Sequence, residues 1–86
     1  MPSIDQFTTD NFHILSYLCE MRGKDDKVSI TQQEIADKFD LSRATVNKII
    51  SELKSEGYIE QDGSHIGRYV LTKAAIKLVR TFLQFK

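Results

Sequence analysis

Two signals for the start of a helix stand close together in this 86-residue chain, at Thr31 and Ser42. Thr31 and Glu34 have the spacing of a capping box, in which each side chain accepts a hydrogen bond from the other residue's backbone N–H. Ser42 carries the short hydroxyl side chain that caps a second helix. Only Asp40-Leu41 breaks the pattern between the two helices. The chain is therefore predicted to fold two short helices joined by a tight turn.

The second of these helices carries few apolar residues. The first helix runs to about Phe39, and the second runs from Arg43 to about Glu56, where Gly57 ends it. The apolar side chains of the second helix form one stripe about 100° wide, made of Val46, Ile49, Ile50 and Leu53. Most of the circumference of this helix is therefore free of the core.

The two ends of the chain predict longer helices. The first covers about residues 10–22, and the last covers about residues 73–85 and begins after the cap Thr72. Their apolar arcs are wide, about 220° on the first helix and about half the circumference on the last. Arcs of this width require that each helix be covered on more than one side.

A β-hairpin is predicted between the second short helix and the last helix. Tyr58–Gln61 and Arg68–Leu71 have the composition of strands, and Asp62-Gly63 is a strong signal for a hairpin turn. A short extended segment, Val28-Ser29-Ile30, precedes the first cap. No repeat or linker interrupts this order, so we expect one domain over residues 1–86, mainly α with a small β-hairpin.

Composition and spacing exclude several classes of function. A single cysteine, Cys19, rules out an internal disulfide framework and fits a reducing, cytoplasmic setting. No apolar run approaches the roughly 20 residues of a membrane span, and the first residues lack the pattern of a signal peptide. His13 and Cys19 lie about 240° apart around their helix and cannot share a metal, and we expect His13 exposed and Cys19 buried. No nucleophile–base pair or phosphate loop is present, so we expect no enzyme, cofactor, metal or small-molecule ligand.

The twelve basic and twelve acidic residues balance to a net charge of zero, but they are unevenly spread. Residues 1–40 hold eight acidic and four basic residues, and residues 41–86 hold eight basic and four acidic residues. A basic second half indicates a surface that faces a polyanion. The alternative is a pair of solvated faces whose opposite charges attract each other.

The second short helix has the face that a DNA major groove requires. The groove admits one α-helix, and a helix with a narrow apolar stripe is free to enter it. The positions opposite Val46 hold Ala44, Lys48, Ser51 and Ser55, with Arg43 and Asn47 at the flank. The small side chains allow close approach, while Arg43, Asn47 and Lys48 supply hydrogen-bonding groups. This pattern predicts a helix that reads base edges.

The same residues resemble known families of bacterial regulators. The resemblance to the helix-turn-helix of the Crp/Fnr regulators lies in Thr31-Gln32-Gln33-Glu34-Ile35-Ala36 and Leu41-Ser42-Arg43-Ala44-Thr45-Val46-Asn47-Lys48. The resemblance to MarR-type winged-helix regulators lies in Glu56-Gly57-Tyr58-Ile59 and Arg68-Tyr69-Val70-Leu71-Thr72. Together the two resemblances imply a winged helix-turn-helix fold. The helix-turn-helix would lie at residues 31–57 and the wing at 58–71, with terminal helices at 10–22 and 73–85.

The resemblance also implies roles for individual positions. Arg43 matches a base-reading arginine, which can contact guanine O6 and N7. Lys48 stands where a second arginine is common, and Ala44 replaces a polar base reader. The implied recognition-helix set is Arg43, Ala44, Thr45, Asn47, Lys48 and Ser51, with Thr45 at a phosphate. The implied backbone-contacting set is Thr31, Gln32, Gln33 and Ser42. In the wing, Ser64, His65 and Arg68 are expected to reach the minor groove or the flanking backbone, unless the hairpin only closes the core.

These inferences favour a small transcriptional regulator that binds a specific double-stranded DNA sequence and represses by occlusion. Because terminal helices of MarR-like proteins pack across a two-fold axis, the resemblance implies a homodimer through the first and last helices. A thick core within one chain is the alternative to that dimer. Plasmid or phage partition or replication control would use the same fold, and a winged-helix module that binds another protein is a further alternative. RNA binding is disfavoured because no aromatic platform is evident.

Overall fold

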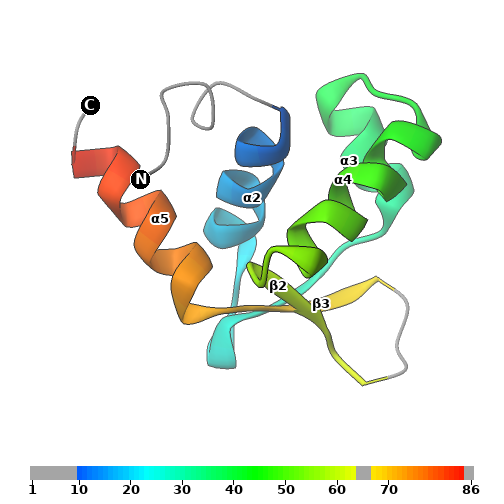
Figure 1. Ribbon diagram of the computed structural model, residues 1–86. Helices are drawn as coiled ribbons and strands as arrows, with labels where there is room; N and C mark the ends of the chain where they lie inside the picture. The colour runs from blue at the N-terminus through cyan, green and yellow to red at the C-terminus, as the bar shows by residue number, and fades with distance from the viewer. Residues whose placement is uncertain (1–9, 64–66, 85–86) are drawn as a thin grey trace.

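The computed structural model describes residues 10–63 and 67–84 of the chain. In chain order its elements are α2 (Asp10–Met21), the 3₁₀ turn η1 (Lys24–Asp26), β1 (Lys27–Ser29), α3 (Gln32–Phe39), α4 (Arg43–Ser55), β2 (Ile59–Gln61), β3 (Arg68–Leu71) and α5 (Lys73–Gln84). Figure 1 shows α2, α3 and α4 grouped above the strands, with α5 at the side of this group.

The bounds agree with the sequence predictions to within one or two residues, because local signals set them. Thr31 and Ser42 cap α3 and α4 as predicted. At the start of α5, the backbone N–H of Ala75 donates a hydrogen bond of 3.3 Å to the Thr72 hydroxyl. The predicted fold class, mainly helical with a small antiparallel hairpin, is therefore confirmed.

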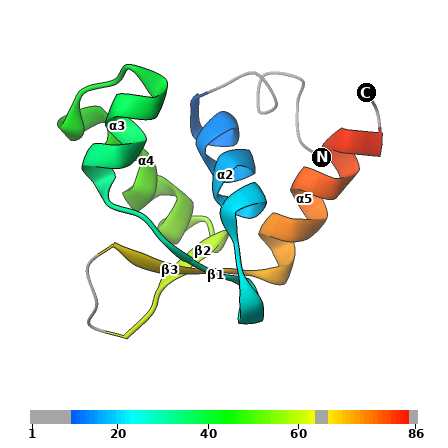
Figure 2. The same cartoon turned by 180° about the vertical axis from the view of Figure 1, so that it is seen from behind.

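A third strand joins the predicted hairpin. The sheet order is β1-β3-β2, and both pairings are antiparallel, with Val28 opposite Tyr69 and Ile59 opposite Leu71. Figure 2 shows β1 crossing next to β3 on the way into α3. The sequence predicted an extended segment here but not its partner, because pairing depends on side chains about 40 residues away along the chain.

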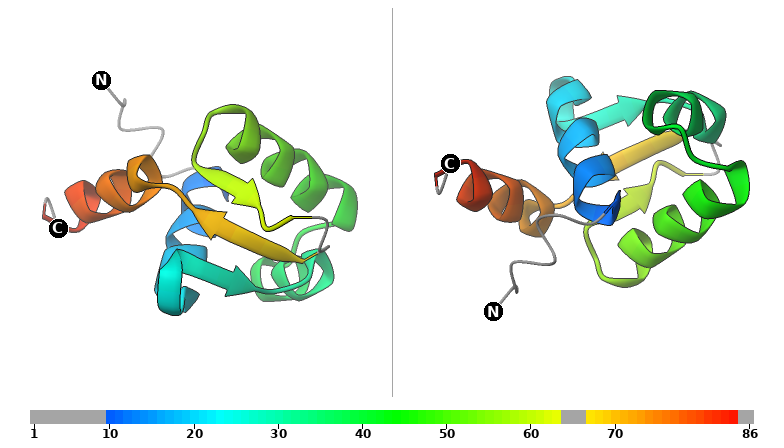
Figure 3. Two further views of the ribbon diagram at one scale, coloured as in Figure 1. Left: turned by 90° about the horizontal axis from the view of Figure 1, so that it is seen from below. Right: turned by 90° about the horizontal axis from the view of Figure 1, so that it is seen from above.

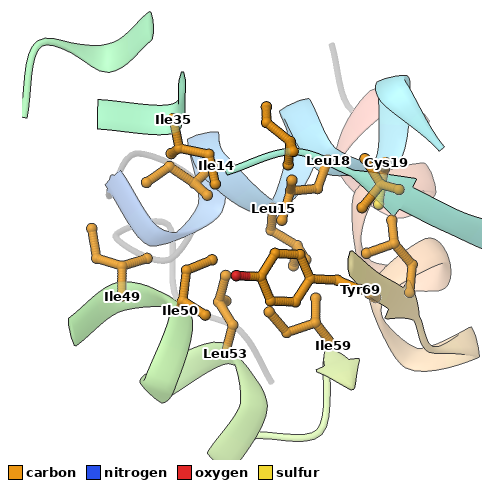
Figure 4. Close-up of a cluster of buried hydrophobic side chains, with 14 of the residues drawn as sticks. Ile14, Leu15, Leu18, Cys19, Ile35, Ile49, Ile50, Leu53, Ile59 and Tyr69 are labelled. Carbon is orange, nitrogen blue, oxygen red and sulfur yellow. The ribbon is translucent and has the colours of Figure 1, made fainter. Parts of the chain in front are cut away.

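The core lies between the helices and one face of this sheet. Its largest fully buried side chains are Ile14, Leu15, Leu18, Ile35, Val46, Ile50 and Ile59. Figure 4 shows the Tyr69 ring pointing from β3 into this cluster, among side chains of α2, α4 and β2. Apart from Tyr69 and Cys19, whose side chains end in a hydroxyl and a thiol, the described buried side chains are purely apolar. Burial of apolar area is therefore what holds the elements together.

Helix α2 lies between α4 and α5 (Figures 1 and 2). It packs on α4, α5 and β1, which bury Phe12, Ile14, Leu15, Leu18 and Cys19. Met21 is the exception, with half of its surface exposed. Most of the wide apolar arc of this helix is thus covered by its own chain. For α2 this matches the thick core within one chain that was the alternative to a dimer.

Helix α5 extends away from the sheet and from α4, as Figure 3 shows from below and from above. It packs on α2, where the rings of Phe12 and Phe82 meet edge to face with centroids 4.8 Å apart. Ala75 and Val79 are buried, but Ile76 and Leu78 are only partly covered. No helix within residues 10–63 and 67–84 has the length and apolar character to cross a membrane.

Gly67 connects the hairpin to β1. Its carbonyl accepts a hydrogen bond of 2.8 Å from the backbone N–H of Ile30. Its φ is +82°, and a Cβ at this position would lie 3.3 Å from the Ile30 carbonyl oxygen. Both the left-handed backbone and the close approach of a second strand therefore favour glycine.

We expect Gly67→Ala to lower the free energy of unfolding by about 2 kcal/mol, because it adds a crowded contact to a left-handed backbone. Gly57→Ala, at φ +81° with no atom within 4 Å of the new Cβ, should lower it by about 1 kcal/mol. Gly23→Ala is the matched control, since Gly23 has a φ of −103° and its nearest neighbour is 3.8 Å away. Urea denaturation measures all three, and equal stability of the Gly67 and Gly23 variants would contradict this account.

Candidate nucleic-acid interface

The capping box at the start of α3 forms as predicted. The Thr31 hydroxyl accepts a hydrogen bond from the Glu34 backbone N–H at 3.1 Å, and the Glu34 carboxylate accepts one from the Thr31 backbone N–H at 3.1 Å. The Thr31 hydroxyl also donates to that carboxylate at 3.1 Å. Glu34 is therefore held as a helix cap, and the start of α3 is fixed in place.

Short-range hydrogen bonds close the turn between α3 and α4. Asp40 ends α3 in the left-handed conformation, with a φ of 55° that aspartate tolerates better than most residues. The Leu41 backbone N–H then donates to the Ala36 carbonyl at 2.9 Å. The Ser42 hydroxyl accepts from the Thr45 backbone N–H at 3.1 Å and donates to the Thr45 hydroxyl at 2.8 Å. These bonds fix where α4 starts.

Helix α4 divides into a buried stripe and an exposed face. The buried residues are the four predicted ones, Val46, Ile49, Ile50 and Leu53. The whole predicted recognition set is exposed: Arg43, Ala44, Thr45, Asn47, Lys48 and Ser51. Arg43 and Lys48 form no hydrogen bond or ion pair with any residue in the described part of the chain. Their charges are therefore available to a ligand on this face.

The first acidic side chain on α4 is already engaged. The Asn11 side chain, from the start of α2, donates a hydrogen bond of 3.2 Å to the Glu52 carboxylate. Residues 43–51 of α4 thus carry two basic side chains and no acidic one. The partial positive charge of the helix N-terminus adds to this field. The exposed face over these residues suits an anionic partner.

The two glutamines at the start of α3 lie in different surroundings. Gln33 donates from Nε2 to Asp37 of the same helix at 2.8 Å. Gln32 instead donates from Nε2 to the Oδ1 of Asn47 on α4 at 3.4 Å. The sequence placed both glutamines in one phosphate-contacting set, because nothing in their spacing showed that Gln32 meets a side chain of the next helix.

The wing is seen only in part. Ser64 and His65, two of the three predicted wing residues, lie outside the described residues. Arg68 is exposed at the start of β3, next to the ion pair of 3.8 Å between Lys27 and Asp62. Arg68 is thus the described wing residue that can meet an external anion.

Lys54 of α4 contacts the hairpin, which the sequence did not indicate. Its ammonium group donates to the Gln61 side chain at 3.1 Å and lies 5.7 Å from the centroid of the Tyr69 ring. It joins the end of α4 to strands β2 and β3. No local signal could have shown this, because the three residues belong to different elements.

The described part of the chain also holds a buried thiol and side chains of the types that bind metals. Within residues 10–63 and 67–84, no three His, Cys, Asp or Glu side chains gather as metal ligands would. Cys19 is 3% exposed, as expected, and His13 is exposed. Burial raises the pKa of the Cys19 thiol from 9.0 to about 11. This thiol therefore stays protonated at neutral pH and is a poor nucleophile.

The sequence pattern of the Crp-like helix-turn-helix domain family matches residues 13–75. These residues hold most of α2, the whole α3–α4 unit and the hairpin strands. The chain belongs to this family. Its strand order and helix arrangement are those of a winged helix.

Known transcription regulators are similar to this Crp-like domain in sequence and in structure. The arabinose metabolism transcriptional repressor of Geobacillus stearothermophilus is 38% identical over an alignment of 58 residues that covers 64% of this chain and 16% of the repressor. MepR of Staphylococcus aureus, a transcription regulator of a multidrug efflux pump, matches with a TM-score of 0.73 and 28% identity over 95% of this chain and 61% of MepR. A CRP-family regulator from Thermus thermophilus shares the fold, with a TM-score of 0.63 and 24% identity over 90% of this chain and 44% of the regulator. The chain thus spans about a sixth of the repressor and three fifths of MepR.

The cap of α4 in this Crp-like domain can be tested by its contribution to stability. We expect Ser42→Ala to lower the free energy of unfolding by about 1 kcal/mol, because the Thr45 backbone N–H loses its partner. Ser51→Ala is the control: this serine is exposed on the same helix, and its change should stay within about 0.5 kcal/mol. Thermal unfolding of both variants measures the difference, and equal midpoints would show that Ser42 is not the cap.

Proposed function

We propose that this domain binds a specific sequence of double-stranded DNA, with α4 in the major groove. The observation that carries the proposal is the exposed face of α4, which is free of acidic side chains over residues 43–51 and rests on a narrow buried stripe. A helix in this position can enter the groove without uncovering the core. MepR, which has the same fold, has been solved in complex with DNA, with a TM-score of 0.71 and 25% identity to this chain.

The proposed base contacts come from the first half of α4. Arg43 is its first residue, and helices of this kind place their N-terminal residues on base edges. Arg43 can donate twice to guanine, and Lys48, five residues further on, can reach guanine or phosphate as a point charge. Ala44 and Ser51 are small enough for close approach, with the Ala44 methyl group suited to a thymine methyl.

The proposed backbone contacts surround the same helix starts. The exposed side chains of Thr31, Gln33, Ser42 and Thr45 stand at the beginnings of α3 and α4, where phosphate oxygens are attracted. In the wing, Arg68 offers a positive charge to a flanking phosphate, and Ser64 and His65 stay in the proposal as the wing's tip. These contacts set the register of α4 in the groove rather than its sequence preference.

We expect the domain to act as a homodimer that represses transcription by occlusion. Because α4, α5 and β1 bury most of the apolar residues of α2, the apolar surface available to a second copy includes the exposed Met21 at the end of α2 and the partly covered Ile76 on α5. A two-fold dimer doubles the phosphate contacts and matches a palindromic site. Similarity to the transcriptional repressor from Geobacillus stearothermophilus supports repression rather than activation.

Arg43→Ala is the decisive substitution for DNA binding. It should weaken binding to a selected site roughly 5- to 150-fold, the effect of one bidentate base contact, and relax the preference at one position. Arg80→Ala removes the same charge from α5, one turn from Ile76, and should leave the base preference unchanged. Duplexes selected from a random pool provide the site, and fluorescence anisotropy at several salt concentrations provides the affinities.

The wild-type affinity should also fall steeply as salt rises, because phosphate contacts release counterions. Binding that is absent, or that does not change with salt, would falsify the DNA proposal and favour a module that binds another protein. Equal effects of the two arginine substitutions would show that charge alone, rather than a base contact, is responsible.

The dimer makes a separate prediction. Sedimentation equilibrium at micromolar concentration should give twice the 9.9 kDa mass of one chain, and Ile76→Lys should shift the equilibrium to the monomer by placing a charge in the apolar contact. Ala74→Lys is the control, since Ala74 is exposed on another side of α5. A monomer at all concentrations, or equal behaviour of the two variants, would contradict dimerisation through this face.

A further inference from the structure

One side-chain contact joins the two helices of the helix-turn-helix at the proposed DNA surface. Gln32 is the first residue of α3 and is half-buried, and Asn47 is exposed on α4. The Gln32 Nε2 donates to the Asn47 Oδ1 at 3.4 Å, across 15 positions of sequence. Two carboxamides therefore meet where α4 faces outward.

The direction of this hydrogen bond decides what Asn47 offers to a ligand. A carboxamide has an oxygen that accepts and a nitrogen that donates, and the two diverge from the same carbon. With Oδ1 turned toward Gln32 on α3, the Nδ2 group points away from α3. Asn47 then presents donors, and not an acceptor, to a base edge.

Both side chains are attached to well-fixed backbone. Thr31, directly before Gln32, is locked by the capping box with Glu34. Asn47 directly follows Val46, which has no exposed surface. Gln33 provides a natural comparison, because it stands one residue further on α3 but bonds to Asp37 of its own helix.

We infer that Gln32 is a positioning residue that selects the hydrogen-bonding group that Asn47 presents to DNA, and so sets the preferred base at one position of the site. This inference rests on the proposed DNA binding. A donor from Asn47 suits the acceptors of guanine, thymine O4 or adenine N7, and it meets a donor, N4–H₂, on cytosine. Gln32 thereby takes a different role from the phosphate contact that the sequence implied for it.

The first test removes the positioning contact. Selection with the Asn47→Ala variant identifies the position that Asn47 reads, and four duplexes that differ only there are compared. Gln32→Ala should reduce the discrimination against cytosine at this position roughly three- to tenfold, because Asn47 can then turn either group to the base. Gln33→Ala removes a proposed phosphate contact, so it should lower the affinity for all four duplexes alike and leave the discrimination unchanged. If Gln32 only contacts phosphate, Gln32→Ala weakens all four duplexes alike, and the inference is overturned.

The second test reverses the contact. A carboxylate only accepts, so in Gln32→Glu the Asn47 nitrogen should turn toward α3 and its oxygen toward the DNA. The preferred base should then shift toward cytosine, whose N4–H₂ donates. Gln33→Glu places the same charge one residue away and should lower affinity without changing the preferred base. Identical selected sequences from the two glutamate variants would overturn the inference.

A measurement without DNA separates this inference from the proposed function. In the free protein, ¹⁵N relaxation of the Asn47 side-chain amide should show an ordered group that becomes mobile in Gln32→Ala but not in Gln33→Ala. An Asn47 amide that is equally mobile in all three proteins would overturn the positioning role even where DNA binding holds. A wild-type protein that selects no DNA sequence overturns the proposed function, and the specificity role of Gln32 with it.

Discussion

The burial of one narrow stripe on α4 controls the rest of this surface. Val46 and Ile50 have almost no exposed area, so the rotation of the helix about its own axis is fixed. With 3.6 residues per turn, that rotation leaves Arg43, Asn47 and Lys48 in solvent. A change that let the helix roll would bury these groups and expose the stripe together. Apolar packing on one side thus sets the polar chemistry on the other.

The sheet connects this recognition unit to the hairpin. Strand β1 pairs with β3 and runs through Ile30 directly into the cap of α3. The hydrogen bond from the Ile30 N–H to the Gly67 carbonyl then holds the start of β3 against the segment between β1 and α3. Lys54 adds a second connection, from the end of α4 to Gln61 on β2. The described part of the wing and the helix-turn-helix are therefore joined through the same strands.

The net charge of the whole chain does not describe the charge on α4. The neutral total hides an α4 face with two basic residues and no acidic residue before Glu52, whose carboxylate accepts a hydrogen bond from Asn11. A few well-placed charges suffice to align a helix in a groove, while a low net charge limits non-specific attraction to phosphate. Under the proposed DNA binding, specificity comes from individual base contacts, so the orientation of a side chain such as Asn47 carries more weight than the total charge.

Much of the fold and of the site could be predicted because the signals are local. The capping box at Thr31 and Glu34, the cap at Ser42 and the stripe around Val46 each depend on residues within four positions of one another, and the structure contains all of them. The exposed face of α4 follows from these signals by periodicity alone. What the tertiary structure decided involves residues far apart in the chain: the pairing of β1 with β3, the cover of α2 by α4 and α5, and the contact between Gln32 and Asn47. The sequence by itself determined which residues face outward, because helix geometry is a short-range property. Only the packed fold decided which of them meet, because that depends on how distant elements are brought together in one core.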